Sequence, residues 1–562
     1  MHIKNPSDDF FKEFLKPYYA LTSDGQYLFA SRQKGRMPDR VFYMAEKLGK
    51  GQRKFDEQEG KEIFGIVEKY IKNADVIEID GCYGDDWKTG VKVFLSIENP
   101  HSGYIAWMGK QMLFPFEGNA NCLNFIIPEG LPDEYKKEVK EISKSYEEPI
   151  SLFDFTQANK DIRRVVNIGI DYFGGAFKKP NLTMVWNRAE MEGMISYHAG
   201  CYDGTVIKGL SGTGKTTLTI GKDIEQDDAL VGMPIYKNGK IEKIRLIGLE
   251  AASFAKSEGI DESSPEWAGL ISSLDGEIVI ALNIDCEGIE FVLKKIDGYE
   301  ALVPEGKAGK LKCKSYEKSG TTNGRFIFKF SILNKNWKKE KYLKAEGLSF
   351  RRYDVLEPIL RVVEPEMAVA FDSACETVIT SAIEGGAGKR VRRYAATDFI
   401  AGEQAEQAWL KLKAYSEIGL DKLVFFVVNT GYVGHSNLEG KKIGDGEKIK
   451  VDETKKLISL VVEGKVKRWI RNPVFGYLIP EPKEMDRYID NFSERFNLFR
   501  FYNAKEIIEF YKRDIEERSK FLKEIFEGQE KEKELEEVIN LWKKFDLPSE
   551  EKIKEFYEEN YR

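Results

Sequence analysis

Residues 209–216 read Gly-Leu-Ser-Gly-Thr-Gly-Lys-Thr, with two glycines five positions apart followed by a lysine and a hydroxyl residue. A loop of this pattern needs a strand before it and a helix after it, because its backbone N–H groups turn inward around an anion at the helix N-terminus. The apolar Val206 and Ile207 supply a short strand directly before the loop. A glycine-rich surface turn, which is the alternative, has no need of that strand. The segment therefore predicts an α/β unit built around a phosphate loop.

The side chains of this loop suit a nucleotide with several phosphates. Lys215 offers a positive charge to the outer phosphates, and the Thr216 hydroxyl suits a divalent cation such as Mg²⁺, because hard cations prefer oxygen ligands that they share with substrate. The predicted phosphate-binding residues are Gly209, Leu210, Ser211, Gly212, Thr213, Gly214, Lys215, Thr216 and Thr217.

The length of the chain, 562 residues, predicts two or three packed units rather than one core. Alternating apolar residues, for example Val91, Val93 and Leu95, predict strands among helices. We therefore expect an α/β fold with two mixed α/β domains, 1–195 on the substrate side and 196–484 with the phosphate loop. A helical C-terminal extension, 485–562, follows from apolar residues spaced as on one helix face: Ile508, Tyr511, Ile515, Leu522 and Phe526. This stripe indicates packing, either over the main body or between subunits.

Charge and composition exclude several classes of partner. A net charge of -7 from 86 basic and 93 acidic residues argues against a general nucleic-acid binder. No apolar run approaches the roughly 20 residues that cross a bilayer, and the first residues lack the pattern of a secretion signal. The six cysteines have no short-spaced pair, which favours reduced thiols. We expect a cytoplasmic protein that contacts neither membrane nor nucleic acid, and the oligomeric state is left open.

Segments on both sides of the loop add charged residues. The stretch from Phe173 to Lys179 places two lysines after a glycine pair, Ser196-Tyr-His198 holds one of four histidines, and Asp227-Asp228 follows the loop. Together with the loop they resemble phosphoenolpyruvate carboxykinase, and the loop itself resembles that of the ATP-dependent branch. The resemblance continues in islands from about residue 35 to 435, through Gly35-Arg36-Met-Pro38, Leu249-Glu250 to Lys256, Pro265-Glu266, Asn323-Gly-Arg325 and Val428-Asn-Thr-Gly431.

The resemblance implies a role for each matching residue. Lys179, His198 and Asp228 would hold Mn²⁺, the lysine as its neutral amine. A second ion, Mg²⁺, would lie on Thr216 and the nucleotide phosphates, with Asp227 holding it through water. The implied catalytic residues, which bind the acid substrate or offset charge in the transition state, are Arg36, Lys178, Lys179, Lys215 and Arg325.

The implied reaction is the metal-dependent conversion of oxaloacetate and ATP to phosphoenolpyruvate, CO₂ and ADP. Several positions depart from the family. Phe173 stands where the family has an aromatic hydroxyl beside CO₂, although Tyr172 is its neighbour, and the run from Gln226 to Val231 keeps the family's two carboxylates but not its other residues. The family's adenine-binding segment is not recognisable in 378–405, so ATP is the default donor and GTP or pyrophosphate stays open.

Two other functions are compatible with the same residues. The first is a kinase on this scaffold that acts on a small-molecule or protein hydroxyl, as the related HPr kinase/phosphorylase does. It would need a base near Asp228 or His198, and the paired Arg36 and Arg325 favour a small anionic acid over a protein. The second is a non-catalytic nucleotide sensor, which would need the phosphate loop but not the metal-binding trio.

Overall fold

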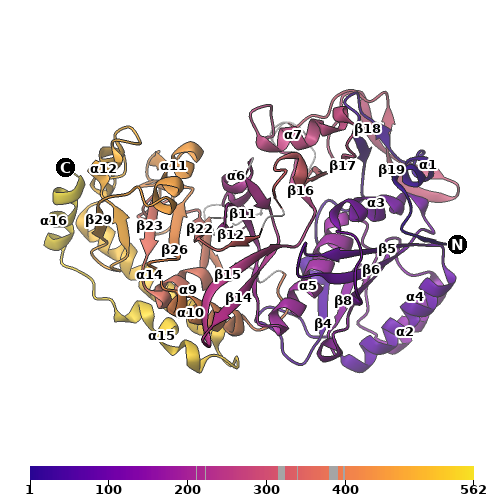
Figure 1. The fold of residues 1–562 in the computed structure, drawn as a ribbon, viewed down its shortest axis with the longest axis horizontal. Helices are drawn as coiled ribbons and strands as arrows, with labels where there is room; N and C mark the ends of the chain where they lie inside the picture. Colours follow the sequence, from indigo (N-terminus) through magenta and orange to yellow (C-terminus); the bar gives the residue numbers. More distant parts are fainter. Residues whose placement is uncertain are drawn as a thin grey trace.

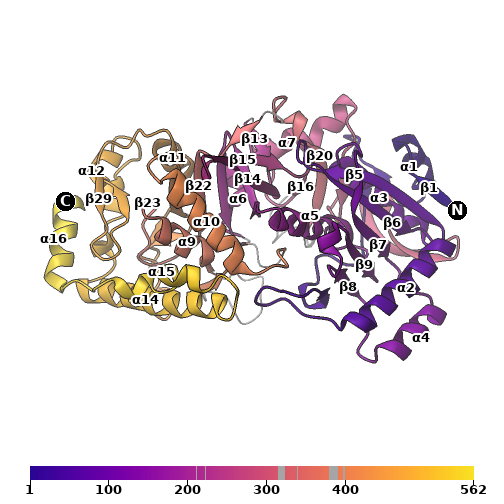
Figure 2. The same cartoon turned by 60° about the horizontal axis from the view of Figure 1, so that its bottom comes forward.

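The computed structural model of the chain describes residues 1–210, 212–221, 223–313, 323–337, 340–378, 390–395 and 399–561. Helices alternate with mixed sheets throughout this part, which confirms the predicted α/β class. Figures 1 and 2 show an elongated molecule whose two ends of the chain lie at opposite ends of its long axis. The division into units at residues 195 and 484 stays a prediction.

The N-terminal half is built on a seven-stranded mixed sheet of order β1-β5-β6-β7-β9-β8-β4. Alternation along β6 turns Val91, Val93 and Leu95 to one face, as predicted, where they join the core under helices α1, α3 and α5. The other face packs against α2 and α4. The bounds are β1 (His2–Lys4), β4 (Val41–Met44), β5 (Val76–Tyr83), β6 (Thr89–Ser96), β7 (Ala120–Ile127), β8 (Ile150–Asp154), β9 (Arg163–Ile168), α1 (Asp8–Phe14), α2 (Glu57–Asn73), α3 (Gly103–Met112), α4 (Asp133–Ile142) and α5 (Lys179–Met191).

An eight-stranded sheet of order β13-β11-β12-β22-β26-β23-β30-β29 forms the body of the C-terminal half. Its central strands β12, β22 and β26 run parallel, so their carboxyl ends meet at one edge, where the phosphate loop follows β12. The strands are β11 (Ala199–Tyr202), β12 (Thr205–Gly209), β13 (Ile224–Gln226), β22 (Ala345–Phe350), β23 (Ile359–Val362), β26 (Val424–Asn429), β29 (Trp469–Arg471) and β30 (Leu478–Pro480). The helices that pack around it are α6 (Lys215–Thr219), α9 (Pro365–Ser373), α10 (Gln404–Ile418), α11 (Val451–Val462), α12 (Pro482–Met485) and α13 (Phe492–Arg495).

Smaller sheets join the two halves. A five-stranded sheet of order β16-β20-β17-β3-β2 combines two strands near the start of the chain with three from residues 252–329, and a four-stranded one has the order β10-β14-β15-β21. The remaining hairpins are β18-β19, β24-β25 and β27-β28. The bounds are β2 (Ala20–Leu21), β3 (Tyr27–Phe29), β10 (Ile195–Tyr197), β14 (Leu230–Lys237), β15 (Lys240–Gly248), β16 (Ala252–Lys256), α7 (Pro265–Ile271), β17 (Ile280–Leu282), β18 (Ile289–Ile296), β19 (Tyr299–Gly306), β20 (Arg325–Lys329), β21 (Lys341–Tyr342), β24 (Cys375–Val378), β25 (Arg390–Arg393), β27 (Tyr432–Val433) and β28 (Glu447–Lys448).

The C-terminal extension is helical, as predicted, and packs on the main body. Its helices are α14 (Ala504–Phe526), α15 (Glu536–Ile539) and α16 (Glu550–Tyr561), and Figure 2 shows α14 lying along the C-terminal half in yellow. Tyr511, Leu522 and Phe526 of the predicted stripe are buried in the same core as the strands of the eight-stranded sheet, and Ile508 and Ile515 pack at its edge. No helix in the described part of the chain is long and apolar enough to span a bilayer.

A buried ion network joins α14 to the end of β22. Arg352, which is fully buried, contacts Asp514 Oδ2 of α14 at 2.9 Å and Glu376 Oε2 at 2.6 Å. Arg390 Nη1 reaches the other oxygen of Asp514 at 2.7 Å. Burial works against charge on Asp514, but Arg352, Arg390 and Arg518 together hold its pKa below the usual value. The extension is therefore attached by charge as well as by apolar packing.

Replacing Asp514 by asparagine should remove one buried counter-charge from both Arg352 and Arg390. We expect Asp514→Asn to lower the free energy of unfolding by about 3 kcal/mol, measured by urea denaturation near pH 7. Because the folded pKa is depressed, this stability is present above pH ~4 and is lost as the pH falls further, so the difference between wild type and variant should shrink in acid. Lys520→Ala, on the exposed side of α14, is the control. Equal stability of Asp514→Asn and wild type would contradict a stabilising role for the network.

Candidate active site

The phosphate loop has the strand and helix that its sequence predicts. It runs from Gly209, the last residue of β12, to Lys215, the first residue of α6. Gly214 has a φ of 93°, a left-handed conformation that favours glycine. A Cβ at Gly209 would lie 2.5 Å from the Ser349 carbonyl oxygen, so only glycine fits this close approach. Ser211 lies outside the described residues.

Two hydroxyl groups hold the loop against the neighbouring strands. The Thr213 carbonyl accepts hydrogen bonds from Ser349 Oγ at 2.5 Å and from Thr430 Oγ1 at 2.8 Å. Thr213 Oγ1 in turn donates to the Leu210 carbonyl at 2.8 Å. Ser349 lies one residue before the end of β22 and Thr430 directly follows β26, so the ends of two parallel strands hold the loop. Neither residue was a predicted phosphate ligand, and their role is to hold the loop's shape.

Lys215 and Thr216 begin the helix that follows the loop, and Thr217 lies in its first turn. Lys215 Nζ donates to the Gly209 carbonyl at 2.8 Å, so the amine folds back over the loop. Burial lowers the pKa of Lys215, while Asp228 and Asp227 work in the opposite direction. The Thr216 hydroxyl contacts Asp227, and Asp227 Oδ2 also accepts a hydrogen bond from Ser253 Oγ at 2.8 Å. The loop lysine and the paired aspartates thus belong to one charged site.

The three predicted metal ligands meet at Asp228. Its Oδ2 lies 2.5 Å from Lys179 Nζ, and its Oδ1 lies 2.9 Å from His198 Nε2. Lys179 begins α5 directly after a π-helical turn, Gly174–Lys178, which starts with the glycine pair. His198 lies between β10 and β11, and Asp228 lies between β13 and β14. Four strands and one helix therefore converge on a single carboxylate.

Burial and neighbouring charges together set the pKa values of the three residues in this cluster. Burial lowers the pKa of Lys179 to about 8, with Lys178 and Arg36 adding to the effect against the pull of Asp228. It also lowers the pKa of His198 to about 3, so the ring is neutral at pH 7. Burial alone would raise the pKa of Asp228, but Lys179, Lys178 and His198 outweigh it and hold that pKa well below the usual value. Because its pKa is lowered, Lys179 loses its proton more easily here than a lysine in water does.

Glu250 is a member of the site that sequence analysis did not single out. Its Oε2 lies 2.6 Å from Lys178 Nζ, and the same amine lies 3.2 Å from Asp228 Oδ2. Burial works against charge on Lys178, but Glu250 and Asp228 together raise its pKa. Lys178 therefore stays charged beside a Lys179 whose pKa is lowered. The signal was available, because Glu250 is an acidic residue inside an otherwise apolar run.

The two predicted substrate arginines lie on segments joined by Asn323. Its Nδ2 donates to the Lys34 carbonyl at 2.7 Å and to the Tyr172 hydroxyl at 3.0 Å, while its Oδ1 accepts from Arg325 Nε at 3.0 Å. Arg36 lies beside the turn that precedes Lys179, because its Cα is 3.9 Å from where a Cβ on Gly175 would stand, and its charge helps to lower the pKa of Lys179. Both arginines thus border the site.

Phe399 closes the cluster, and sequence analysis missed it. Its ring centre lies 4.1 Å from Lys179 Nζ and 4.4 Å from Arg36 Cζ. The His198 ring meets it edge to face at 4.4 Å between centres. One aromatic ring that contacts two cations and a histidine fixes their spacing by cation–π contact and packing. Nothing local in the sequence distinguishes this phenylalanine from a core residue.

Phe173 is fully buried and has no polar contact to offer. It packs against Phe177 and Phe254, with ring centres 5.4 and 5.0 Å apart. The adjacent Tyr172 points its hydroxyl to Asn323, on the side of Arg325. A phenolic hydroxyl is therefore present at the substrate side, one position before the phenylalanine.

The donor atoms suit divalent cations at two places. In the described part of the chain, the buried His198 Nδ1 and Asp227 Oδ1 have no hydrogen-bond partner in the protein, so each has a lone pair to offer. Amine, imidazole and carboxylate fit Mn²⁺ at Lys179, His198 and Asp228, and oxygen donors fit Mg²⁺ at Thr216 and Asp227. Among the same described residues, no three His, Cys, Asp or Glu side chains form a metal cluster, so the first site depends on the lysine.

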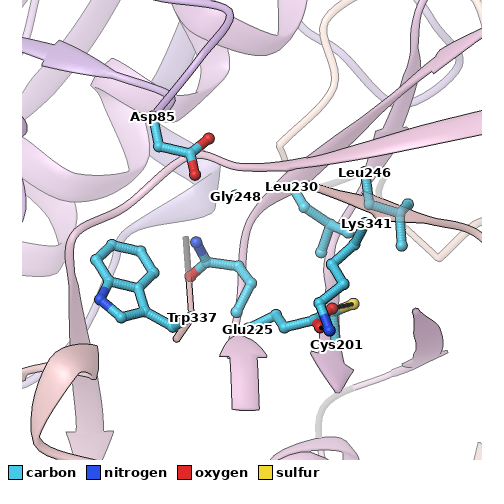
Figure 3. A pocket seen from close by; sticks show the side chains of 9 residues that line it. Asp85, Cys201, Glu225, Leu230, Leu246, Gly248, Trp337 and Lys341 are labelled. Atoms are coloured by element: carbon cyan, nitrogen blue, oxygen red, sulfur yellow. Dashed lines mark hydrogen bonds and ion pairs between the residues drawn. The ribbon is translucent and has the colours of Figure 1, made fainter. Parts of the chain in front are cut away.

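A small cavity lies elsewhere, beside β13, and Figure 3 shows the side chains around it. Glu225 lines this cavity. It accepts a hydrogen bond from Cys201 Sγ at 3.2 Å and forms an ion pair with Lys341 Nζ at 2.9 Å. The lining residues are Asp85, Cys201, Glu225, Gln226, Leu230, Leu246, Gly248, Trp337 and Lys341. Since none of the predicted site residues lines it, this cavity is separate from the candidate active site.

The comparisons with known proteins agree with the site. Residues 3–262 match the family described as phosphoenolpyruvate carboxykinase, in its ATP-dependent form. The match includes the phosphate loop, Arg36, both lysines, His198 and the paired aspartates, and it ends before Arg325. A search of curated proteins found no match to the chain.

If Asp228 is the carboxylate ligand, its loss should weaken the Mn²⁺ site more than the fold. We expect Asp228→Asn to raise the Mn²⁺ dissociation constant about 10- to 100-fold in an electron paramagnetic resonance titration, because a neutral amide replaces a charged ligand. The exposed neighbour Asp223 provides the control Asp223→Asn, which should bind as wild type does. Unchanged Mn²⁺ affinity in Asp228→Asn would remove it from the ligand set.

Proposed function

We propose that this chain, which over residues 3–262 is of the ATP-dependent phosphoenolpyruvate carboxykinase type, converts oxaloacetate and ATP to phosphoenolpyruvate, CO₂ and ADP. The observation that carries the proposal is the meeting of Lys179, Lys178 and His198 at Asp228, next to Lys215 of the phosphate loop. A protein that only binds nucleotide has no use for this second cluster. The cluster therefore supports catalysis over a nucleotide sensor.

The acid substrate meets two fixed cations. Arg36 and Arg325 offer planar forks that suit carboxylates, and Asn323 holds the Arg325 side. When the C–C bond to the departing carboxylate breaks and CO₂ is released, its electron pair forms the C=C bond and the carbonyl π pair moves onto oxygen, which leaves an enolate. Lys178, kept charged by Glu250, lies where it offsets that negative charge.

The enolate oxygen then attacks the γ-phosphorus of ATP in line, and the bond to the β-phosphate oxygen breaks to release ADP. The loop N–H groups and Lys215 hold the donor phosphates, and Thr213 is fixed by Ser349 and Thr430 so that the loop keeps its shape. Bound Mn²⁺ and Mg²⁺ would supply Lewis-acid stabilisation of the oxygens whose charge changes. The protein's own contribution is positional and electrostatic.

The buried Phe173 favours one alternative. The Phe173 ring carries no hydroxyl to place beside CO₂. The second candidate is therefore a kinase that transfers phosphate to an existing hydroxyl without decarboxylation. The Tyr172 hydroxyl, held by Asn323 on the Arg325 side, favours the carboxykinase reaction, since it can donate where Phe173 cannot.

The proposal is tested by incubating the protein with Mn²⁺, Mg²⁺ and oxaloacetate and following phosphoenolpyruvate by ³¹P NMR, with ATP, GTP or pyrophosphate supplied separately. We expect a phosphoenolpyruvate signal with ATP. Lys215→Ala should lower its rate of formation about 10²- to 10³-fold, because a cation that acts on the transferred phosphoryl group is lost. Lys240→Ala, an exposed lysine of β15, is the control. ATP hydrolysis without phosphoenolpyruvate from any donor would favour the kinase.

Tyr172 has its own test. If its hydroxyl acts beside the substrate, Tyr172→Phe should slow phosphoenolpyruvate formation about tenfold, the worth of roughly one hydrogen bond, while ATP binding stays unchanged. The exposed Tyr236 gives the matched control Tyr236→Phe. A Tyr172→Phe enzyme as fast as wild type would leave the hydroxyl with a structural role only.

A further inference from the structure

The segment that carries Phe399 is hydrogen-bonded to residues from both the N-terminal half and the C-terminal extension. It runs from Phe399 to Ala405 at the start of α10, and the described residues around it come from residues 49–52 of the N-terminal half and from Gln529 of the extension. The Ala401 carbonyl accepts from Gly49 N at 2.9 Å, and the Ile400 carbonyl accepts from Gln52 Nε2 at 2.6 Å. The position of Phe399 thus depends on contacts that are distant in sequence.

Gln404 makes two of these contacts with its side-chain amide. Its amide meets the backbone of Lys50 with two bonds, accepting from Lys50 N at 2.9 Å and donating to Lys50 O at 3.0 Å. Gly49 permits the approach, because a Cβ there would lie 2.4 Å from the Gly402 carbonyl oxygen. The side chain of Gln404 is almost fully buried, so these bonds are shielded from water.

Gln529 completes the junction from the extension. Its Nε2 donates to Gln404 Oε1 at 2.8 Å and to the Ile525 carbonyl at 2.8 Å, and its Oε1 accepts from Ala405 N at 2.7 Å. These three hydrogen bonds need an amide at position 529, because the side-chain nitrogen must donate twice while the side-chain oxygen accepts once. A carboxylate of the same shape would place negative charge against two acceptor oxygens.

Neighbouring contacts hold the same turn in place. Glu530 N donates to Glu403 Oε2 at 3.0 Å, and the Glu530 carboxylate pairs with Lys47 at the surface. The extension therefore reaches both the segment that carries Phe399 and the N-terminal loop that contacts it. The exposed ion pair contributes little by itself, whereas the buried amide bonds fix the geometry.

We propose that Gln529 is a positioning residue for the active site: through Gln404 and residues 399–405, it holds Phe399 against Lys179, His198 and Arg36. The inference rests on the proposed function only for its catalytic consequence. The extension lies outside residues 3–262, which match the family, and it then contributes to the site without touching substrate.

The test compares Gln529→Glu and Gln529→Met with Lys520→Ala on the exposed side of α14. Hydrogen exchange follows the amides of Ala405 and Lys50. The ring signal of His198, one of four histidines, reports the Phe399 contact in protein carrying ¹³C-labelled histidine. Phe399→Leu gives the reference position of that signal when the aromatic neighbour is absent.

We expect both Gln529 variants to exchange these amides at least about tenfold faster than Lys520→Ala, with the His198 signal displaced toward its Phe399→Leu position. In the active enzyme, KM for the carboxylate substrate should rise about 3- to 10-fold, corresponding to one buried hydrogen bond, with KM for ATP unchanged. Methionine carries no charge, so agreement between the two variants excludes a merely electrostatic effect.

Wild-type exchange, or an unmoved His198 signal despite faster exchange, would overturn the proposal. Both readouts are independent of turnover. These two measurements therefore test whether Gln529 positions Phe399 even if the protein forms no phosphoenolpyruvate. The positioning role and the proposed function can thus be contradicted independently.

Discussion

The carboxylate of Asp228 is the group on which the rest of the site depends. It is partly buried and contacts two lysines and a histidine, so its negative charge allows these three nitrogen groups to lie close together. Burial pulls the lysine pKa down while Asp228 pulls it up, and the balance leaves Lys179 close to losing its proton. Lys179 as its neutral amine, His198 and Asp228 would hold a divalent cation here, with Asp228 supplying the negative charge.

The surrounding structure keeps this arrangement rigid from three sides. Glu250 fixes Lys178 and so separates the roles of two consecutive lysines. The strand ends Ser349 and Thr430 fix the phosphate loop. Phe399 forms a wall that contacts both Lys179 and Arg36. Several of these supports lie beyond residue 262, where the family match ends, so the C-terminal half completes a site that the N-terminal half begins.

The sequence predicted the parts of the site that depend on local patterns. The loop glycines and the strand before them follow from backbone conformations that the loop requires, and the helical stripe of the extension follows from its period. The meeting of Lys179, His198 and Asp228 came from a resemblance rather than from spacing, because no periodicity brings positions 179, 198 and 228 together. Phe399 and Gln529 were missed for a related reason, and Glu250 was named only within a family-like segment, without a role. Their roles arise from contacts between distant segments, such as the 124 residues that separate Gln529 from Ala405.

The most direct test of the account is a crystal of the protein with Mn²⁺, with the ion located by its anomalous scattering. The account predicts an anomalous peak within bonding distance of Lys179 Nζ, the Asp228 carboxylate and a ring nitrogen of His198, with Lys179 turned from its ion pair toward the ion. A peak elsewhere, with Lys179 still paired to Asp228, would contradict the central claim that these three residues form the metal site.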